Sequence, residues 1–164
     1  IEVANLAIGY AMTVTPLQLA QGYTILAAGG VKRPISLVKN DRIPRGERVL
    51  PEKTVKELLK MLALVTEKEG TGTRAIVDGY HVGGKTGTAF IAGRHGYDHT
   101  RVMASFAGLV PIDKPRLVCV VVVTEPQGAH FGGVIAAPVF AKVMSGALRL
   151  LAVPPDNLPQ KTDA

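Results

Sequence analysis

The segment from Gly79 to Phe90, GYHVGGKTGTAF, contains two overlapping patterns that carry different chemistry. From Gly79, the letters G-Y-H-V-G-G-K-T match the phosphate loop G-x-x-x-x-G-K-[ST], in which backbone N–H groups bind the phosphates of a nucleotide. From Lys85, the letters K-T-G-T place one ammonium and the hydroxyls of Thr86 and Thr88 along the edge of a short extended segment, where they can hold a carboxylate. The first pattern predicts a nucleotide hydrolase, and the second predicts a site for a carboxylate ligand.

The residues after Lys85 and Thr86 favour the second pattern. A phosphate loop leads directly into a helix, whose N-terminal N–H groups and dipole hold the phosphates. Here the sequence continues as GTAFIAG, which has two glycines and no amphipathic helical period, so we predict a β-strand from Gly84 to Ile91. In such a strand, Gly87 between the two threonines allows an extended ligand to approach the backbone closely.

Two helices and an extended segment are predicted before this strand. The residues Thr15–Gln18 form a capping box with proline at the first helical position, and they predict a helix that continues to about Ala28. The segment Val31–Val38 is predicted to be extended. A second helix is predicted to begin at Pro51 and to stop at Gly70, because apolar residues recur there at helical spacing. These apolar residues are Val55, Leu58, Leu59, Leu62 and Val65.

Two further extended runs and one helix are predicted after the strand. The runs VMASFAGLVP and RLVCVVVVTE, with Gly84–Ile91, predict a three-stranded antiparallel meander. Pro138 is predicted to begin a last helix that ends before Pro154. The residues predicted to face inward from this helix are Val139, Phe140, Val143, Met144, Ala147 and Leu151. Helices followed by a sheet and a final helix predict an α+β fold, with an antiparallel sheet packed against helices.

The composition excludes several classes of protein. The chain has 164 residues and a formal net charge of +6, but its basic residues are scattered and aromatic residues are few, so no nucleic-acid partner is expected. The single cysteine, Cys119, lies in an apolar run and predicts neither a disulfide framework nor a metal box; no cofactor or metal is expected. The sequence has no signal peptide and no run of about 18 apolar residues, so any membrane anchor is expected upstream of Ile1.

The order of these segments resembles the C-terminal half of the transpeptidase domain of class B penicillin-binding proteins. The likeness is closest to the division-specific, septal enzymes of Gram-negative bacteria, and it covers nearly the whole chain. It implies a fold like that of the serine β-lactamases. The segments that carry it are IGYAMTVTPLQLA, GGKTGTA, HFGG, APVFAKVMSGALRLL and VPPDNLP.

The resemblance implies roles for the residues of the K-T-G box. Lys85, Thr86 and Gly87 match the box itself, and Thr88 matches the position that follows it. In the family, the backbone N–H at the position of Thr88 completes an oxyanion hole, and the hydroxyl contacts the carboxylate of the substrate or of penicillin. Phe131 matches an aromatic wall of the cleft. The resemblance therefore implies that Lys85 and Thr88 are catalytic, and that Thr86, Gly87, Thr88 and Phe131 bind substrate.

Other parts of the family pattern are altered or missing. His130 stands where some relatives carry tyrosine, and Phe90 where many carry arginine or glutamine. The family's Ser-x-x-Lys nucleophile and Ser-x-Asn box are not matched; Ser36 and Lys39 have the Ser-x-x-Lys spacing, but the residues around them predict a strand, and this chemistry needs a helix. Residues 1–164 are therefore expected to be the C-terminal part of the domain, with the nucleophile on an upstream segment of the same protein.

The resemblance implies a serine-type peptidoglycan D,D-transpeptidase that cross-links stem peptides during septal cell-wall synthesis and is acylated by β-lactam inhibitors. It implies a periplasmic domain of a protein anchored in the inner membrane, with division proteins as partners. Two alternatives remain open at this point. One is a nucleotide hydrolase of the phosphate-loop type, and the other is a non-catalytic remnant that binds carboxylates.

Four other residues carry weaker signals. His95 and His99 have metal-like spacing, but they fall in the polar segment AGRHGYDHT, which predicts a surface loop without a third ligand. Asp78 and Glu125 could flank the cleft, but the default interpretations are an acid in a turn for Asp78 and an acid at the end of a strand for Glu125.

Overall fold

The computed structural model describes residues 2–7, 9, 12–93 and 96–158. Its helices are α1 (Glu2–Ala7), α2 (Pro16–Ala27), α3 (Glu52–Leu64) and α4 (Gly132–Leu150), with a short 3₁₀ helix, η1 (Thr73–Ala75). Its strands are β1 (Val31–Lys32), β2 (Glu47–Arg48), β3 (Gly83–Gly93), β4 (Gly96–Val110) and β5 (Leu117–Thr124).

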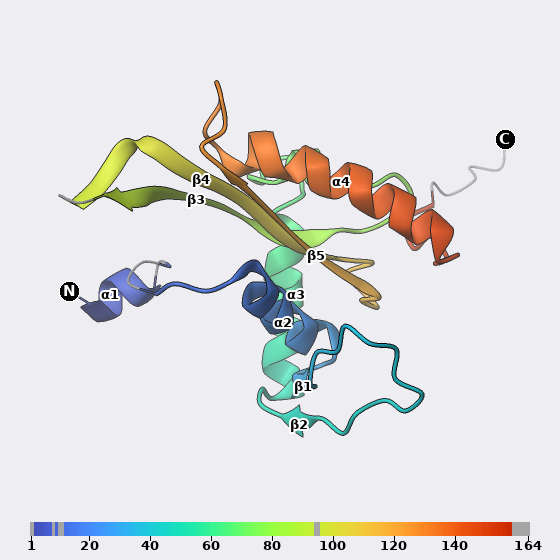
Figure 1. The fold of residues 1–164 in the computed structure, drawn as a ribbon. Coiled ribbons are helices and arrows are strands. Elements are labelled where there is room, and N and C mark those ends of the chain that lie inside the picture. The colour runs from blue at the N-terminus through green and yellow to red at the C-terminus, as the bar shows by residue number, and fades with distance from the viewer. Residues whose placement is uncertain (1, 8, 10–11, 94–95, 159–164) are drawn as a thin grey trace, which may run out of the picture.

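Strands β3, β4 and β5 form an antiparallel sheet in that order, and helices lie on both of its faces (Figure 1). Helix α4 lies along one face, and α2 and α3 lie against the other. Lys85 on β3 pairs with Ala107 on β4, and Thr86 pairs with Phe106. The predicted meander, its pairing and the α+β class are therefore confirmed.

The main core lies between the sheet and α4. Phe106 on β4 and Phe140 on α4 are fully buried, and their rings meet edge to face with centroids 4.9 Å apart. Other buried residues of this core include Val110, Ala136, Ala137, Met144 and Leu148. By length and composition alone α4 is apolar enough to cross a membrane, but these contacts with the sheet make it a core helix.

The predicted start of α4 at Pro138 is wrong, because the helix begins at Gly132 and Pro138 lies inside it. Two adjacent glycines usually favour the end of a helix, yet here they let the helix start directly on the sheet. A Cβ on Gly132 would come well within 3.0 Å of the carbonyl oxygens of Gly87 and Ser105.

The inward face of α4 was only partly predicted. Phe140 and Met144 are buried as expected, whereas Val139, Val143 and Leu151 are 44%, 50% and 61% exposed. The buried side chains follow Ala136, Phe140, Met144 and Leu148, at a spacing of four residues, which is one stripe of the helix surface. The predicted stripe was too wide because Val139 and Val143 are apolar residues that lie beside the buried row and are partly exposed.

The predicted cap of α2 is confirmed. The hydroxyl oxygen of Thr15 accepts from the Gln18 N–H at 3.2 Å, and the Thr15 N–H donates to Gln18 Oε1 at 2.8 Å. Helix α2 nevertheless contains no fully buried side chain, although its sequence is mostly apolar. On α3, whose N-cap is Pro51, only Val55 is fully buried. These two helices therefore leave apolar surface exposed.

One predicted extended segment and one predicted loop differ from the structure. Only Val31–Lys32 of the segment predicted to be extended pairs as a strand, because Pro34 cannot donate a ladder hydrogen bond and Ser36 folds back on Val38. The polar segment AGRHGYDHT was predicted to be a loop, but β3 reaches Gly93 and β4 begins at Gly96. A register shift between Phe90 and Ile91 accommodates this longer hairpin.

Candidate active site

The K-T-G-T residues lie on β3, an edge strand of the sheet that pairs only with β4 in the part of the chain that the structure describes. An edge strand keeps one side of its backbone available to an extended ligand. No helix follows Lys85 and Thr86, so the strand geometry removes the basis for the phosphate-loop alternative.

The two threonine hydroxyls point to the face of the sheet that carries α4. Thr86 Oγ1 shares a hydrogen bond of 2.9 Å with Thr71 Oγ1, from the loop after α3. Thr88 Oγ1 accepts from the backbone N–H of Gly132, at the first residue of α4, at 3.2 Å. Both hydroxyls are therefore held in place by neighbouring elements, as a preorganised ligand site requires.

The side chain of Lys85 points to the opposite face of the sheet, because successive side chains along a strand alternate between its two faces. Its side chain is exposed, and its Nζ donates to the carbonyl oxygen of Thr86 at 2.9 Å. Lys85 also lines an apolar cavity of about 630 Å³ between α2, α3 and β3. Burial beside this cavity raises the pKa of the Tyr23 hydroxyl, which is a sign of low local polarity.

The other residues lining the cavity are Met12, Val14, Gln18, Leu19, Gly22, Leu26, Leu58, Met61, Leu62 and Val65. Most of these side chains are aliphatic, and Met12 and Met61 are 63% and 61% exposed. Lys85 is the only charged residue of the lining. The cavity is therefore an open, mostly apolar surface with the ammonium group of Lys85, from the K-T-G box, at its edge.

Gly87 permits close packing between β3, β4 and the start of α4. A Cβ at this position would collide with the hydroxyl of Ser105, the residue that pairs with Gly87 across the sheet. The Gly87 carbonyl in turn lies against Gly132. Because Gly87 shares the Lys85 face of the strand, the absence of its side chain leaves that face open beside Ser105.

Phe131 lies next to these threonines. It is the N-cap of α4, and the following residue, Gly132, donates to Thr88. The Phe131 side chain is 69% exposed, so it is available to a ligand. His130 precedes it and is also exposed, while Phe90 lies at the register shift, two residues beyond Thr88. The structure therefore groups Thr86, Thr88 and Phe131 at the start of α4.

The weaker candidates lie elsewhere or have structural partners. Ser36 lies in a segment that is neither helix nor strand, so the predicted strand is wrong there, but the helix that a Ser-x-x-Lys nucleophile needs is also absent at this position. Glu125 accepts hydrogen bonds from Nε of Arg101, at 2.7 Å, and from Nη2 of the same side chain. Asp78 is exposed in a turn. His95 lies outside the described residues, and His99 lies on β4 rather than in the predicted loop.

Sequence reasoning missed three residues of this region: Thr71, Ser105 and Gly132. Ser105 was accessible in principle, because the predicted meander places the middle of the SFAGLVP run opposite the K-T-G box. Thr71 and Gly132 reach the site only through the tertiary fold. No local pattern marks Thr71, and the HFGG segment contains Gly132 without indicating its contact with Thr88.

The chain thus presents Lys-Thr-Gly-Thr on an edge strand of an antiparallel sheet within an α+β fold. Residues 1–145 match the family described as "Penicillin binding protein transpeptidase domain". The chain therefore belongs to the penicillin-binding protein transpeptidase family.

Individual relatives agree with this assignment. The chain is 41% identical over 158 residues to the probable peptidoglycan D,D-transpeptidase PenA of Neisseria meningitidis serogroup A, covering 94% of this chain and 27% of the relative. It is 41% identical over 159 residues to the peptidoglycan D,D-transpeptidase FtsI of Escherichia coli K12, covering 96% and 27%. The chain thus spans about a quarter of the length of these curated relatives.

A solved structure shows the same fold. The transpeptidase domain of penicillin-binding protein 3 from Burkholderia pseudomallei, in its apo form, superimposes with a TM-score of 0.88 and 42% sequence identity. The match covers 96% of this chain and 48% of that chain.

Proposed function

We propose that this chain supplies the K-T-G strand of a serine-type peptidoglycan D,D-transpeptidase. The observation that carries the proposal is the pair of hydroxyls of Thr86 and Thr88, each held by a hydrogen bond on an edge strand, with Lys85 of the same strand lining an apolar cavity. The similarity to the D,D-transpeptidases PenA and FtsI supports the same function.

In the proposed reaction, a serine hydroxyl outside this chain attacks the carbonyl carbon between the two D-alanines of a stem peptide. The terminal D-alanine leaves with a proton on its amine, and an acyl-enzyme ester remains. An amine of a neighbouring strand then attacks the ester, forms the cross-link and returns the proton to the serine. β-Lactams enter at the first step and form a stable ester in place of the substrate.

Thr88 has two roles in this reaction. Its backbone N–H, with that of the serine, stabilises the oxyanion that develops in both steps, and one such donor is worth roughly 3 kcal/mol. Its hydroxyl, with that of Thr86, binds the substrate carboxylate. Gly87 leaves room for the extended peptide, and Phe131 packs against it. Lys85 is the catalytic cation of the site.

We propose that an upstream segment of the same protein fills the cavity beside Lys85, and that residues 1–164 are the C-terminal part of the transpeptidase domain. Three features support this. The cavity is almost entirely apolar and open, α2 has no buried side chain, and α1 lies away from the sheet (Figure 1). Apolar surface of this extent is unfavourable in water and is normally covered.

The similarity to FtsI also supports a place in septal cell-wall synthesis, with division proteins as partners and peptidoglycan stem peptides as substrates. We propose that the domain is periplasmic and belongs to a protein anchored in the inner membrane, with the anchor outside this chain.

Labelling with fluorescent penicillin tests the proposal. The complete protein is expected to form a covalent adduct that survives denaturing electrophoresis, and the 164-residue chain alone is not. Lys85→Ala in the complete protein is expected to slow acylation at least about tenfold, since a lost charge-assisted contact is worth about 1.5–3 kcal/mol. Lys53→Ala, on the exposed surface of α3, is the matched control.

Two outcomes would contradict the proposal. If the complete, folded protein forms no adduct, the non-catalytic carboxylate-binding remnant becomes the better description. If the isolated chain is labelled at Ser36, the nucleophile lies within this chain after all.

A further inference from the structure

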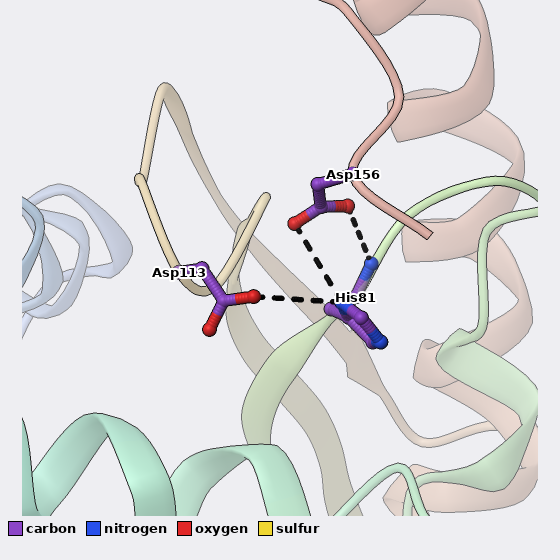
Figure 2. Close-up of side chains that lie close together, drawn as sticks. All are labelled: His81, Asp113 and Asp156. Atoms are coloured by element: carbon purple, nitrogen blue, oxygen red, sulfur yellow. Dashed lines mark hydrogen bonds and ion pairs between the residues drawn. The ribbon is translucent and has the colours of Figure 1, made fainter. Parts of the chain in front are cut away.

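Three side chains from distant parts of the chain converge at the end of the sheet remote from the threonine pair. His81 lies just before β3, Asp113 lies in the turn between β4 and β5, and Asp156 lies in the segment that follows α4. Figure 2 shows the carboxylates of both aspartates directed toward His81. One ligating atom from each residue lies within 4.8 Å of the others.

The separations between the His81 imidazole and the two carboxylates are too long for hydrogen bonds. His81 Nδ1 lies 3.5 Å from Asp113 Oδ2 and 3.8 Å from Asp156 Oδ2, whereas N–H···O bonds measure about 2.7–3.2 Å. They are close to the spacing of ligands around a metal ion. Zn²⁺ bound at roughly 2.0–2.2 Å in a tetrahedral site holds its ligand atoms about 3.3–3.6 Å apart.

Backbone hydrogen bonds fix the three segments relative to one another. The N–H of Ile112, next to Asp113, donates to the carbonyl of His81 at 2.9 Å. The N–H of Asp156 donates to the carbonyl of Gly79 at 3.2 Å, and the His81 N–H donates to Asp156 Oδ1 at 2.9 Å. This last bond occupies one carboxylate oxygen and leaves Oδ2 directed at the imidazole. Formation of the metal site therefore requires little further ordering.

The charge of the cluster is not compensated by a basic side chain. Among the described residues, no Lys or Arg lies within 4.0 Å of either carboxylate. The cluster adjoins a cavity of about 310 Å³ that is also lined by Glu67 and Asn157. Side-chain exposures of 49%, 76% and 23% for His81, Asp113 and Asp156 give an ion direct access from solvent.

From this geometry we propose that His81, Asp113 and Asp156 form a zinc site, with a fourth position open to water. An imidazole with two carboxylates suits Zn²⁺ better than Ca²⁺ or Mg²⁺, which prefer oxygen ligands alone. The ion would join the segment after α4 and the β4–β5 turn to the residues that lead into β3. His81 is four residues from Lys85, roughly 13 Å along an extended chain, so the site is structural rather than catalytic.

Calorimetric titration of the metal-free complete protein with ZnCl₂ tests the proposal. We expect Asp113→Asn, at an exposed position where folding is not at risk, to weaken zinc binding at this site at least tenfold, and His81→Gln to do the same. Asp78→Asn and His130→Gln are the controls, because they remove one carboxylate and one imidazole that do not belong to the proposed site. Both variants are expected to bind zinc as the wild type does. Co²⁺ in place of zinc should give the intense visible absorption of a tetrahedral site, which Asp113→Asn removes.

The proposal is overturned if the wild-type protein shows no saturable zinc binding at this site, or if Asp113→Asn and His81→Gln bind zinc as tightly as the wild type does. Equal loss in Asp78→Asn or His130→Gln would also overturn it. None of these measurements depends on penicillin labelling, so the result is independent of the proposed transpeptidase activity.

Discussion

Gly132→Ala is expected to be the most informative single substitution in this chain. Gly132 is where α4 meets the sheet, and the added Cβ would come well within 3.0 Å of the backbone carbonyl oxygens of Gly87 and Ser105. Backbone atoms of paired strands cannot rotate away as a flexible side chain can. The helix start must therefore shift, and the N–H of Gly132 would lose its bond to Thr88.

The cost follows from these two effects. Overpacking of this kind destabilises a protein by about 1–3 kcal/mol, and a lost hydrogen bond by about 0.5–1.5 kcal/mol. Together we expect the free energy of unfolding to fall by roughly 2–4 kcal/mol. Because Thr88 and Phe131 flank Gly132, acylation by penicillin should also slow in the fraction that remains folded.

Gly146→Ala is the matched control, because it makes the same chemical change in the same helix. A Cβ on Gly146 meets no atom within 4 Å, and alanine favours a helix over glycine by about 1 kcal/mol. Urea unfolding of the complete protein should therefore show a lower midpoint for Gly132→Ala and an equal or higher midpoint for Gly146→Ala. Equal midpoints for Gly132→Ala and the wild type would refute the packing argument.

Three further predictions concern the site and the core. Thr71→Val is expected to slow penicillin acylation by up to about tenfold and to lower the free energy of unfolding by only about 0.5–1.5 kcal/mol, since it removes the hydrogen bond to Thr86; unchanged acylation rates would exclude a positioning role. Phe106→Ala should destabilise by about 3–5 kcal/mol in urea unfolding because it deletes the buried ring that packs on Phe140, and a loss under 1 kcal/mol would place the core elsewhere. Burial raises the pKa of the Cys119 thiol, so its thiolate fraction at pH 8 is smaller in the native protein than in the unfolded chain. Alkylation by iodoacetamide should therefore be slower in the native protein and should accelerate as the pH is raised; equal alkylation rates for the native and unfolded protein would contradict this.

The sequence predicted the site strand well because several local signals agreed there. Alternation, turn residues and two further apolar runs all indicated a meander, whereas the register of Lys85 with Ala107 was seen only in the structure. The cap of α2 was equally predictable, since the capping box is satisfied within four residues.

The start of α4 and the partners of the threonines were not predictable in the same way. Gly132 is a poor helix residue by intrinsic propensity, and it begins a helix because the sheet leaves no room for a Cβ. That reason exists only after β3 and β4 are paired. The bond from Thr71 to Thr86 and the approach of Asp156 to His81 likewise join segments with no shared local pattern.

The residues of the proposed site lie on the two opposite faces of β3. Period two directs Thr86 and Thr88 toward α4, where the bonds to Thr71 and Gly132 hold their hydroxyls, and directs Lys85 toward the apolar cavity. A carboxylate bound by the threonines is therefore on the α4 side, whereas whatever fills the cavity meets the ammonium directly. In a cavity lined by aliphatic side chains, a single ammonium is poorly solvated unless the occupant brings polar groups to it. We therefore expect the upstream segment to present hydroxyl or amide groups to Lys85. Hydrogen bonds from Lys85 to these groups would then connect the upstream segment to the K-T-G-T residues of β3.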